Sequence, residues 1–458
     1  MEHQSRKKGF EVNALSGSIF KNMLLFALPI MGTGLLRILF SVADTVVIGR
    51  FGHEGAISAI GVSASVLHLL ISGLMALGTG VTVVCGRLFG KNDERSASNL
   101  LHSLPLTGFL LGCILSVLVI IFTDHILRWI SCPDSLMRDA ALYFRIYFTG
   151  VPFSVVVSLL SAYIHSKGNS VIPFLFEMGA AVLNILMNLV FVIVLDWNVA
   201  GVAVATAISQ ALCAAAFMCY LAMQKGTDRL RIRKLTLFSG LKEVFALGIP
   251  AAIEGMVLNV SNVIISAAVN KFDSGVIGGN TIAANIEGIM AIAFVGFANA
   301  AVVFISQNHG KGNYPRIKKI FVVAAATVFI GAELLGIIIY SASPILTRIF
   351  TYDPVYIASA RTRMFFMCLF YGLCGLMNLI SGCIRGLGET RLPLIISLIC
   401  SVAFRITWIY TYAASKGTIE SIYVSYPICW ALYAAIGLTA FFLVLRKRIR
   451  ENSENAQD

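Results

Sequence analysis

The chain has 458 residues, of which 58% are hydrophobic and only 13% are charged, and its mean hydropathy is +0.84. Soluble domains carry about 25% charged residues, so this composition excludes a soluble globular protein and predicts a helical protein that crosses a membrane many times. The formal net charge of +12 could suggest nucleic acid, but basic residues beside anionic lipid explain it more simply, so we expect no nucleic-acid partner.

Apolar runs long enough to cross a bilayer, about 20 residues each, occur repeatedly along the chain. In order they lie at 22–49, 56–86, 101–123, 139–165, 171–195, 198–224, 243–270, 279–307, 317–343, 360–386, 391–413 and 421–446. We therefore predict an all-α membrane protein with twelve transmembrane helices. Its predicted parts are an N-terminal segment at 1–21, an N-lobe at 22–224, a basic linker at 225–242, a C-lobe at 243–446 and a tail at 447–458.

The distribution of lysine and arginine predicts the orientation of these helices. With the N-terminus inside the cell, the inner segments hold about three times as many of these residues as the outer loops, as the positive-inside rule requires. We therefore expect both termini in the cytoplasm, and a first span that is retained as a helix because many more follow it. Most of the ten cysteines lie within spans without metal-ligand spacing, so we expect packing residues and no metal site.

The second half of the chain repeats the first. The stretch "LPIMGTGLLRILFSVADTVVIGRFG" aligns with "IPAAIEGMVLNVSNVIISAAVNKFD" at an offset of 221 residues, and "SAYIHSKGNSVIP" aligns with "SGCIRGLGETRLP" at an offset of 220. Each half contains six predicted helices, an even number, so both halves have the same orientation and are related by an axis along the membrane normal. Two such lobes predict a cleft that opens to either side in turn, which is the architecture of alternating access.

The alignment pairs two prolines, Pro29 and Pro250, each inside the first helix of its lobe. Proline removes a backbone hydrogen bond and kinks a helix, and neighbouring helices can satisfy the freed carbonyl. Two roles stay open: a fixed bend for packing, and a hinge that bends differently in different states.

Several stretches together carry a family resemblance. They are "VADTVVIGRFG", "GTGVTVVCGRLFGKND", "LNILMNLVFVIV", "GVAVATAISQ", "FISQNHGKGN", "IRGLGETRLP" and "FRITWIY". In this order they resemble the multidrug and toxic compound extrusion (MATE) transporters, particularly the bacterial DinF-like branch. The resemblance implies two six-helix bundles around a V-shaped cavity in the bacterial inner (plasma) membrane, and export of bulky organic cations in exchange for protons or sodium. It implies no cofactor, and we expect a monomer whose partners are small amphiphilic substrates and membrane lipids.

Asp44 lies within the first apolar run. A carboxylate at membrane depth costs at least a few kcal/mol, so it must face a cavity or a partner. It could also be a charge that reaches the outer membrane boundary. The resemblance places a functional aspartate at this Asp-Thr position, so we predict that Asp44 couples transport to a proton or a cation.

Three polar residues of the first lobe accompany Asp44 in this prediction. Asn184 and Asn188 are four residues apart and share one helix face. The resemblance implies Asn-x-x-x-Asp at these positions, so Asn188 removes one carboxylate from the expected ion site. Thr206 matches a further polar position of the family. Interhelical hydrogen bonding and an ion or substrate role remain equal alternatives for all three.

Four charged residues within spans are predicted to contact substrate: Glu254, Glu287, Arg37 and Arg405. The resemblance implies a glutamate eight residues after Pro250, where this chain has Leu258, so Glu254 stands one helical turn away. The alternative for the two glutamates is pairing with Arg405 or another donor. Arg405 itself is more simply a structural counter-ion than an anion site. Aromatic candidates for the cavity wall are Phe40, Phe153, Phe294 and Tyr371.

Motifs of other function classes are absent from the sequence. It contains no GxxxxGK[ST], HExxH or GxSxG motif, which argues against an ATP-driven pump and an enzyme. Gly90-Lys91 and Gly310-Lys311 are expected to be helix stops. The alternative function is a flippase for lipid-linked saccharides of the same superfamily. An anionic lipid would need several basic residues in the cavity, whereas few arginines lie within the spans, so cation export is favoured.

Overall fold

The computed structural model describes residues 10–53, 56–130 and 132–454, and this part of the chain contains helices but no β-strand. Within it, eleven helices are long and apolar enough to cross a membrane, and a further pair, bent by 49°, brings the number of spans to twelve. The predicted all-α fold with twelve transmembrane helices is therefore confirmed.

The described chain divides into two compact units, one formed by residues 10–11 and 32–252 and the other by residues 12–31 and 253–454. Helix α1 (Ile19–Phe51) begins in the second unit and continues in the first unit. The change of unit lies two residues after Pro29. Helix α8 (Lys242–Val269) begins in the first unit and continues in the second unit. The change of unit lies two residues after Pro250. The two changes of unit occur at equivalent positions of the repeat. The first turns of each helix therefore belong to one unit and its later turns to the other.

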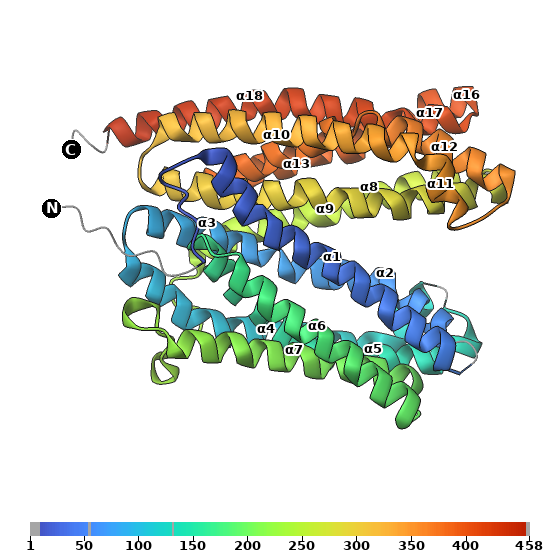
Figure 1. Cartoon of the computed structure of the whole chain (residues 1–458), viewed down its shortest axis with the longest axis horizontal. Helices are drawn as coiled ribbons and strands as arrows, with labels where there is room; N and C mark the ends of the chain where they lie inside the picture. The colour runs from blue at the N-terminus through green and yellow to red at the C-terminus, as the bar shows by residue number, and fades with distance from the viewer. Residues whose placement is uncertain (1–9, 54–55, 131, 455–458) are drawn as a thin grey trace. The chain divides into compact units, whose positions relative to one another are not determined.

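The first unit contains the helices labelled α2 to α7 in Figure 1. It is built around helix α5, which has the largest buried share of any span in the described chain. It packs against α2, α3, α4 and α7. Besides parts of α1 and α8, the unit contains α2 Ala56–Met75, α3 Leu77–Gly90, α4 Glu94–Trp129, α5 Asp134–Ser166, α6 Val171–Asn188, the π-helix η1 Leu189–Val194, α7 Asn198–Met223 and the short 3-10 helices η2 Gly226–Asp228 and η3 Ile232–Lys234.

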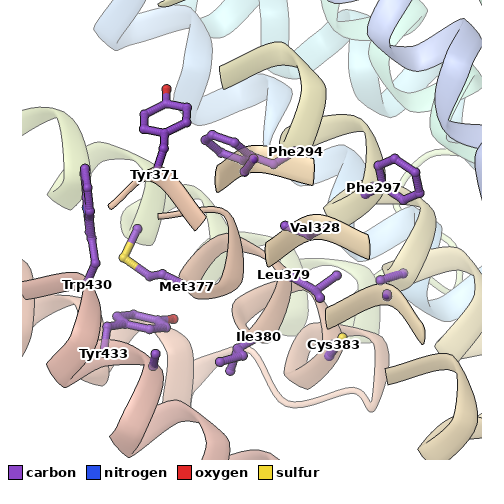
Figure 2. Close-up of a cluster of buried hydrophobic side chains, with 14 of the residues drawn as sticks. Phe294, Phe297, Val328, Tyr371, Met377, Leu379, Ile380, Cys383, Trp430 and Tyr433 are labelled. Carbon is purple, nitrogen blue, oxygen red and sulfur yellow. The ribbon is translucent and has the colours of Figure 1, made fainter. Parts of the chain in front are cut away.

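The second unit surrounds α13 in the same way, with α9, α10 and α18 packed against it. Its elements, besides parts of α1 and α8, are α9 Ser274–Gly310, α10 Tyr314–Ser341, α11 Ser343–Arg348, α12 Pro354–Cys368, α13 Tyr371–Gly386, α14 Arg391–Ser397, η4 Leu398–Ala403, α15 Phe404–Trp408, η5 Ile409–Ala413, α16 Ala414–Lys416, α17 Ile419–Tyr423 and α18 Ser425–Glu454. Figure 2 shows its apolar core, where Phe294, Tyr371 and Trp430 lie close together.

The predicted span at 360–386 is not a single straight helix. Helices α12 and α13 meet at a 49° bend after Cys368. At such a break the first amides of the new helix lose their intrahelical acceptors. Glu333 of α10 satisfies one of them, because its Oε2 accepts a hydrogen bond from the Gly372 amide at 2.8 Å. A side chain from a neighbouring helix therefore stabilises the bend.

The predicted span at 391–413 also departs from a regular α-helix, because it contains two π-helical segments, η4 and η5. The segment η5 begins 220 residues after η1, so the repeat extends to this irregular feature. Segments of π-helix occur often at functional sites. In the first unit the segment follows Asn188 directly.

The predicted helix stops are confirmed in both units. Helix α3 ends at Gly90 and α9 ends at Gly310, each followed by lysine. The next helix then begins with a side-chain cap: Asp93 accepts from the Ser96 amide at 3.0 Å, and Asn313 accepts from the Arg316 amide at 3.2 Å. These bonds satisfy amides that have no intrahelical partner. The hydrogen bonds from Ser96 also lower the pKa of Asp93.

The basic linker is hydrogen-bonded to α4 of the first unit. The Arg231 amide donates to His102 Nε2 at 3.1 Å, while His102 Nδ1 lies 2.6 Å from the Ser98 carbonyl. Since Nε2 accepts here, Nδ1 is the ring nitrogen that donates to the Ser98 carbonyl. The Thr236 amide donates to the His102 carbonyl at 3.1 Å. The linker is thus a packed segment of the first unit.

Close packing between α10 and α12 gives a first testable prediction. A Cβ at Gly336 would lie 1.9 Å from the Cys368 carbonyl oxygen, whereas a Cβ at Gly331 of the same helix meets nothing within 4 Å. We expect Gly336→Ala to destabilise the protein by about 1–3 kcal/mol through overpacking and Gly331→Ala not to destabilise it. Thermal unfolding in detergent measures both. Equal midpoints for the two variants would contradict the packing.

Candidate functional site

The first unit contains a polar cluster formed by three helices. Asp44 of α1 is partly buried, and Asn188, at the end of α6, is fully buried. The Asn188 amide nitrogen donates a hydrogen bond to Asp44 Oδ1, so this carboxylate within a membrane span has an uncharged partner. The four-residue spacing of Asn184 and Asn188 places both on the helix face toward Asp44.

Asn184 extends the cluster to α7. Its amide nitrogen donates to Thr206 Oγ1 at 3.3 Å, and its oxygen accepts from Asn188 Nδ2 at 3.3 Å. When the amide is turned by 180°, its nitrogen donates to Asp44 Oδ1 at 3.2 Å and its oxygen accepts from the Thr206 amide at 3.2 Å. In the turned orientation Asn184 hydrogen-bonds Asp44 and Thr206 directly. The structure brings together all four residues predicted for ion coupling.

The cluster also presents an unused acceptor. The amide oxygen of Asn188 is buried and has no hydrogen-bond partner in the described part of the chain. A buried oxygen without a partner is costly, and together with the Asp44 carboxylate and the Thr206 hydroxyl it offers oxygen ligands of the kind that hard cations prefer. The described residues include no group of three His, Cys, Asp or Glu side chains suited to a metal ion.

Arg37 lies on the same helix as Asp44 but in a different environment. Its Nη2 is 3.3 Å from Glu177 Oε2 of α6, and its side chain is largely exposed. The structure thus pairs Arg37 with a carboxylate of its own unit. The sequence offered no signal for this partner, because the two residues are 140 positions apart.

In the second unit, Glu254 of α8 is buried among hydroxyl groups. Its Oε1 accepts from Ser381 at 2.7 Å and from Ser397 at 3.5 Å. Its Oε2 lies 3.9 Å from Arg385 Nη1 but has no hydrogen-bond partner in the described chain. Glu254 therefore keeps one oxygen without a hydrogen bond, opposite the guanidinium of Arg385, a partner that the sequence did not predict.

Glu287 of α9 is fully engaged by Arg363 of α12. Arg363 Nε and Nη2 donate to the two carboxylate oxygens at 2.9 and 2.7 Å, and Nη1 donates to Asn280 at 2.5 Å. Both charged side chains are buried. Arg363 also lies 5.9 Å from the ring centroid of Tyr423. This two-pronged ion pair leaves Glu287 little capacity to contact a cationic substrate.

Arg405 of α15 is buried and pairs with neutral groups. Its Nη1 donates to Ser261 at 2.8 Å and to Asn262 at 3.4 Å, and its guanidinium lies 4.3 Å from the ring centroid of Tyr426. The two glutamates predicted as its alternative partners pair with Arg363 and Arg385 instead. These two arginines were missed because both lie near span ends, where basic residues were attributed to membrane orientation.

The aromatic candidates have ordinary packing roles where contacts are described. Phe294 and Tyr371 meet edge to face at 5.4 Å within the second unit's core (Figure 2). Phe153 meets Phe109 in the same way at 5.5 Å. Phe40 is partly buried on α1.

A repeated pair of helical units, each with ionisable side chains buried at membrane depth, has the construction of a secondary transporter. Comparison with known proteins identifies the family. The MatE family model matches this chain twice, at residues 29–190 and 250–411, so the chain belongs to the MatE family and is a multi-pass membrane transporter, not an enzyme. The two matches begin at Pro29 and Pro250, which confirms the repeat.

Named relatives extend over most of the chain. It is 26% identical to the probable multidrug resistance protein YoeA of Bacillus subtilis, over 91% of this chain and 92% of the relative. It is 22% identical to the multidrug export protein MepA of Staphylococcus saprophyticus, over 84% of this chain and 85% of that protein. These relatives support small-molecule transport and do not favour the flippase alternative.

Solved structures share the fold. A transporter of the MOP superfamily from Pyrococcus furiosus superimposes with a TM-score of 0.88 at 18% identity, covering 97% of this chain and 99% of its own. A multidrug resistance MATE transporter in an outward-facing conformation gives the same TM-score, identity and coverage.

Proposed function

We propose that this protein is a secondary active exporter. It moves organic cations or other amphiphilic small molecules out of a bacterial cell in exchange for protons or sodium ions, by alternating access. The observation that carries the proposal is the contact of Asp44 with Asn188, at the junction of three helices. The names of the multidrug resistance and export relatives support the substrate class. In this proposal the protein is a monomer in the inner membrane with both termini in the cytoplasm.

Asp44 would couple ion binding to the helices around it. An ionised carboxylate only accepts hydrogen bonds, whereas a protonated one also donates. Ionised Asp44 accepts hydrogen bonds from the amide nitrogens of Asn188 and, in the turned orientation, of Asn184. Protonation of Asp44 would replace an acceptor with a donor and so change the hydrogen bonds of this cluster. A sodium ion would instead bind the oxygens of Asp44 and Asn188.

The prolines would act as the hinges of this cycle. Proline weakens the helix at one point, and Pro29 and Pro250 lie two residues from the points at which α1 and α8 change unit. Bending α1 at Pro29 would move Asp44 relative to the start of the same helix. Such a bend gives the ion different contacts in two states, which is what a shift between them requires.

In the second unit we assign the substrate contact to Glu254 and not to Glu287. Glu254 keeps one carboxylate oxygen without a hydrogen bond, and a cationic substrate could displace Arg385, whose Nη1 lies 3.9 Å from that oxygen. Glu287 is satisfied by Arg363. Arg37 and Arg405, each with partners in its own unit, would act on the cargo only through charge.

Purified protein in liposomes tests the function. We expect either an imposed proton gradient or an imposed sodium gradient to drive movement of ethidium, a fluorescent organic cation, across the membrane. The gradient that works identifies the coupling ion. Folded protein that moves no tested cation under either gradient would contradict the proposal, and lipid scrambling would then be assayed.

A further inference from the structure

The second unit contains a cavity between α11 and the first two turns of α12, two helices that pack against each other. Its volume is about 500 Å³, within the range of small-molecule sites. Arg348, Tyr352 and Arg361 are its polar lining residues, and the other lining residues are apolar. Helix α10 ends at Ser341 and the next span begins with α12 at Pro354, so the cavity lies at the ends of membrane spans.

The lining of this cavity carries two positive charges and no negative charge. Arg348 of α11 and Arg361 of α12 are both exposed, and neither makes a hydrogen bond or an ion pair in the described part of the chain. Asp353, the acidic residue between the two helices, accepts from the Val355 amide at 2.8 Å and is not part of the lining. The two arginines therefore favour an anion, and the planar donors of a guanidinium match phosphate oxygens.

Exposed apolar side chains flank Arg348 on α11 and in the turn after it. Ile345 and Ile349 are 71% and 74% exposed, whereas Thr347 is fully buried. Tyr352 of the cavity lining is 85% exposed. Residues three and four apart share a helix face, so the outward face of α11 combines apolar side chains with a guanidinium. Such an amphipathic segment suits the membrane interface, where tyrosine is also enriched.

We propose that this cavity binds the headgroup of an anionic phospholipid. The phosphate oxygens accept hydrogen bonds from Arg348 and Arg361, and the acyl chains lie against Ile345 and Ile349. A free phosphate ion would satisfy the two arginines but would leave the apolar side chains in water, so a lipid fits both features of the site. The bound lipid holds α11 and the start of α12 in the membrane interface. The site depends neither on Asp44 nor on the proposed export.

Native mass spectrometry of the purified full chain in detergent tests the site, with phosphatidylglycerol and phosphatidylcholine of the same acyl chains as probes. We expect the tightest site to prefer phosphatidylglycerol, because phosphatidylcholine has no net charge. Arg348→Gln and Arg361→Gln should each weaken phosphatidylglycerol binding on the order of fivefold, and the double variant should lose the preference. The control is Lys416→Gln, which removes an exposed positive charge of the same unit outside the cavity lining and should leave the preference unchanged.

Equal affinity for the two lipids, or an unchanged preference for phosphatidylglycerol in the double variant, would overturn the site. An equal effect of Lys416→Gln would also overturn it, because the preference would then reflect the charge of the whole unit. Excess inorganic phosphate separates the two sources of the anion. We expect it to leave the lipid bound, whereas full displacement would assign the cavity to a small anion and not to a lipid.

Discussion

Asp44→Asn is expected to abolish ethidium efflux driven by an ion gradient, with a loss of at least tenfold in initial rate. Asparagine has nearly the same shape and can still hydrogen-bond Asn188, but it carries no charge and takes up no proton. The coupling ion then loses its binding group, and its gradient no longer favours one state over the other. Transport in liposomes measures the rate, and thermal unfolding in detergent verifies that the variant is folded.

Asp124→Asn is the matched control for this experiment. This substitution also replaces an aspartate by asparagine, here on α4. The Asp124 carboxylate pairs with Arg145 at 2.9 Å, and both side chains are about half exposed. Exposed ion pairs contribute about 0–1 kcal/mol to stability, so this variant should transport normally. Unimpaired gradient-driven efflux by Asp44→Asn would show that coupling resides elsewhere.

Glu287→Gln is expected to be the most destabilising of the charge-removing substitutions in the second unit. It leaves the buried guanidinium of Arg363 without its carboxylate, and breaking a buried ion pair on one side costs about 3–5 kcal/mol. The thermal unfolding midpoint in detergent should fall clearly. Glu177→Gln is the control, because its partner Arg37 is largely exposed and the pair contributes little.

A second substitution separates a structural Glu287 from a substrate contact. In the double variant Glu287→Gln, Arg363→Met the unpaired charge is gone, so most of the lost stability should return. Cation efflux should return with it. A Glu287→Gln variant of normal stability that loses cation efflux would instead assign Glu287 to the cargo.

Helix spacing and the family resemblance together predicted the first-unit cluster. Asn184 and Asn188 are one helical turn apart, so they share a face wherever the helix lies, and a carboxylate at membrane depth must find polar partners. The resemblance grouped these two asparagines with Asp44 and Thr206. The hydrogen bonds that join Asn184 to Asp44 and Thr206 could not be predicted, because they depend on distances between residues of different helices.

The second unit shows where such reasoning stops. Glu287 and Arg363 are 76 residues apart, and the bend after Cys368 is stabilised by Glu333, which belongs to another helix. Hydropathy detects the length of a span but not the neighbour that each polar group meets. From the sequence, Arg363 and Arg385 were therefore interpreted as basic residues that orient the helices in the membrane.

The sequence by itself determined the class of protein, the number of spans and the repeat, because each span needs only a local apolar run and the repeat is visible as matched residues. Only the tertiary structure decided which acids are paired and which keep a free oxygen. It also decided where α1 and α8 change unit. The physical reason is that partners of buried polar groups are set by packing between helices distant in the chain, which no local pattern records.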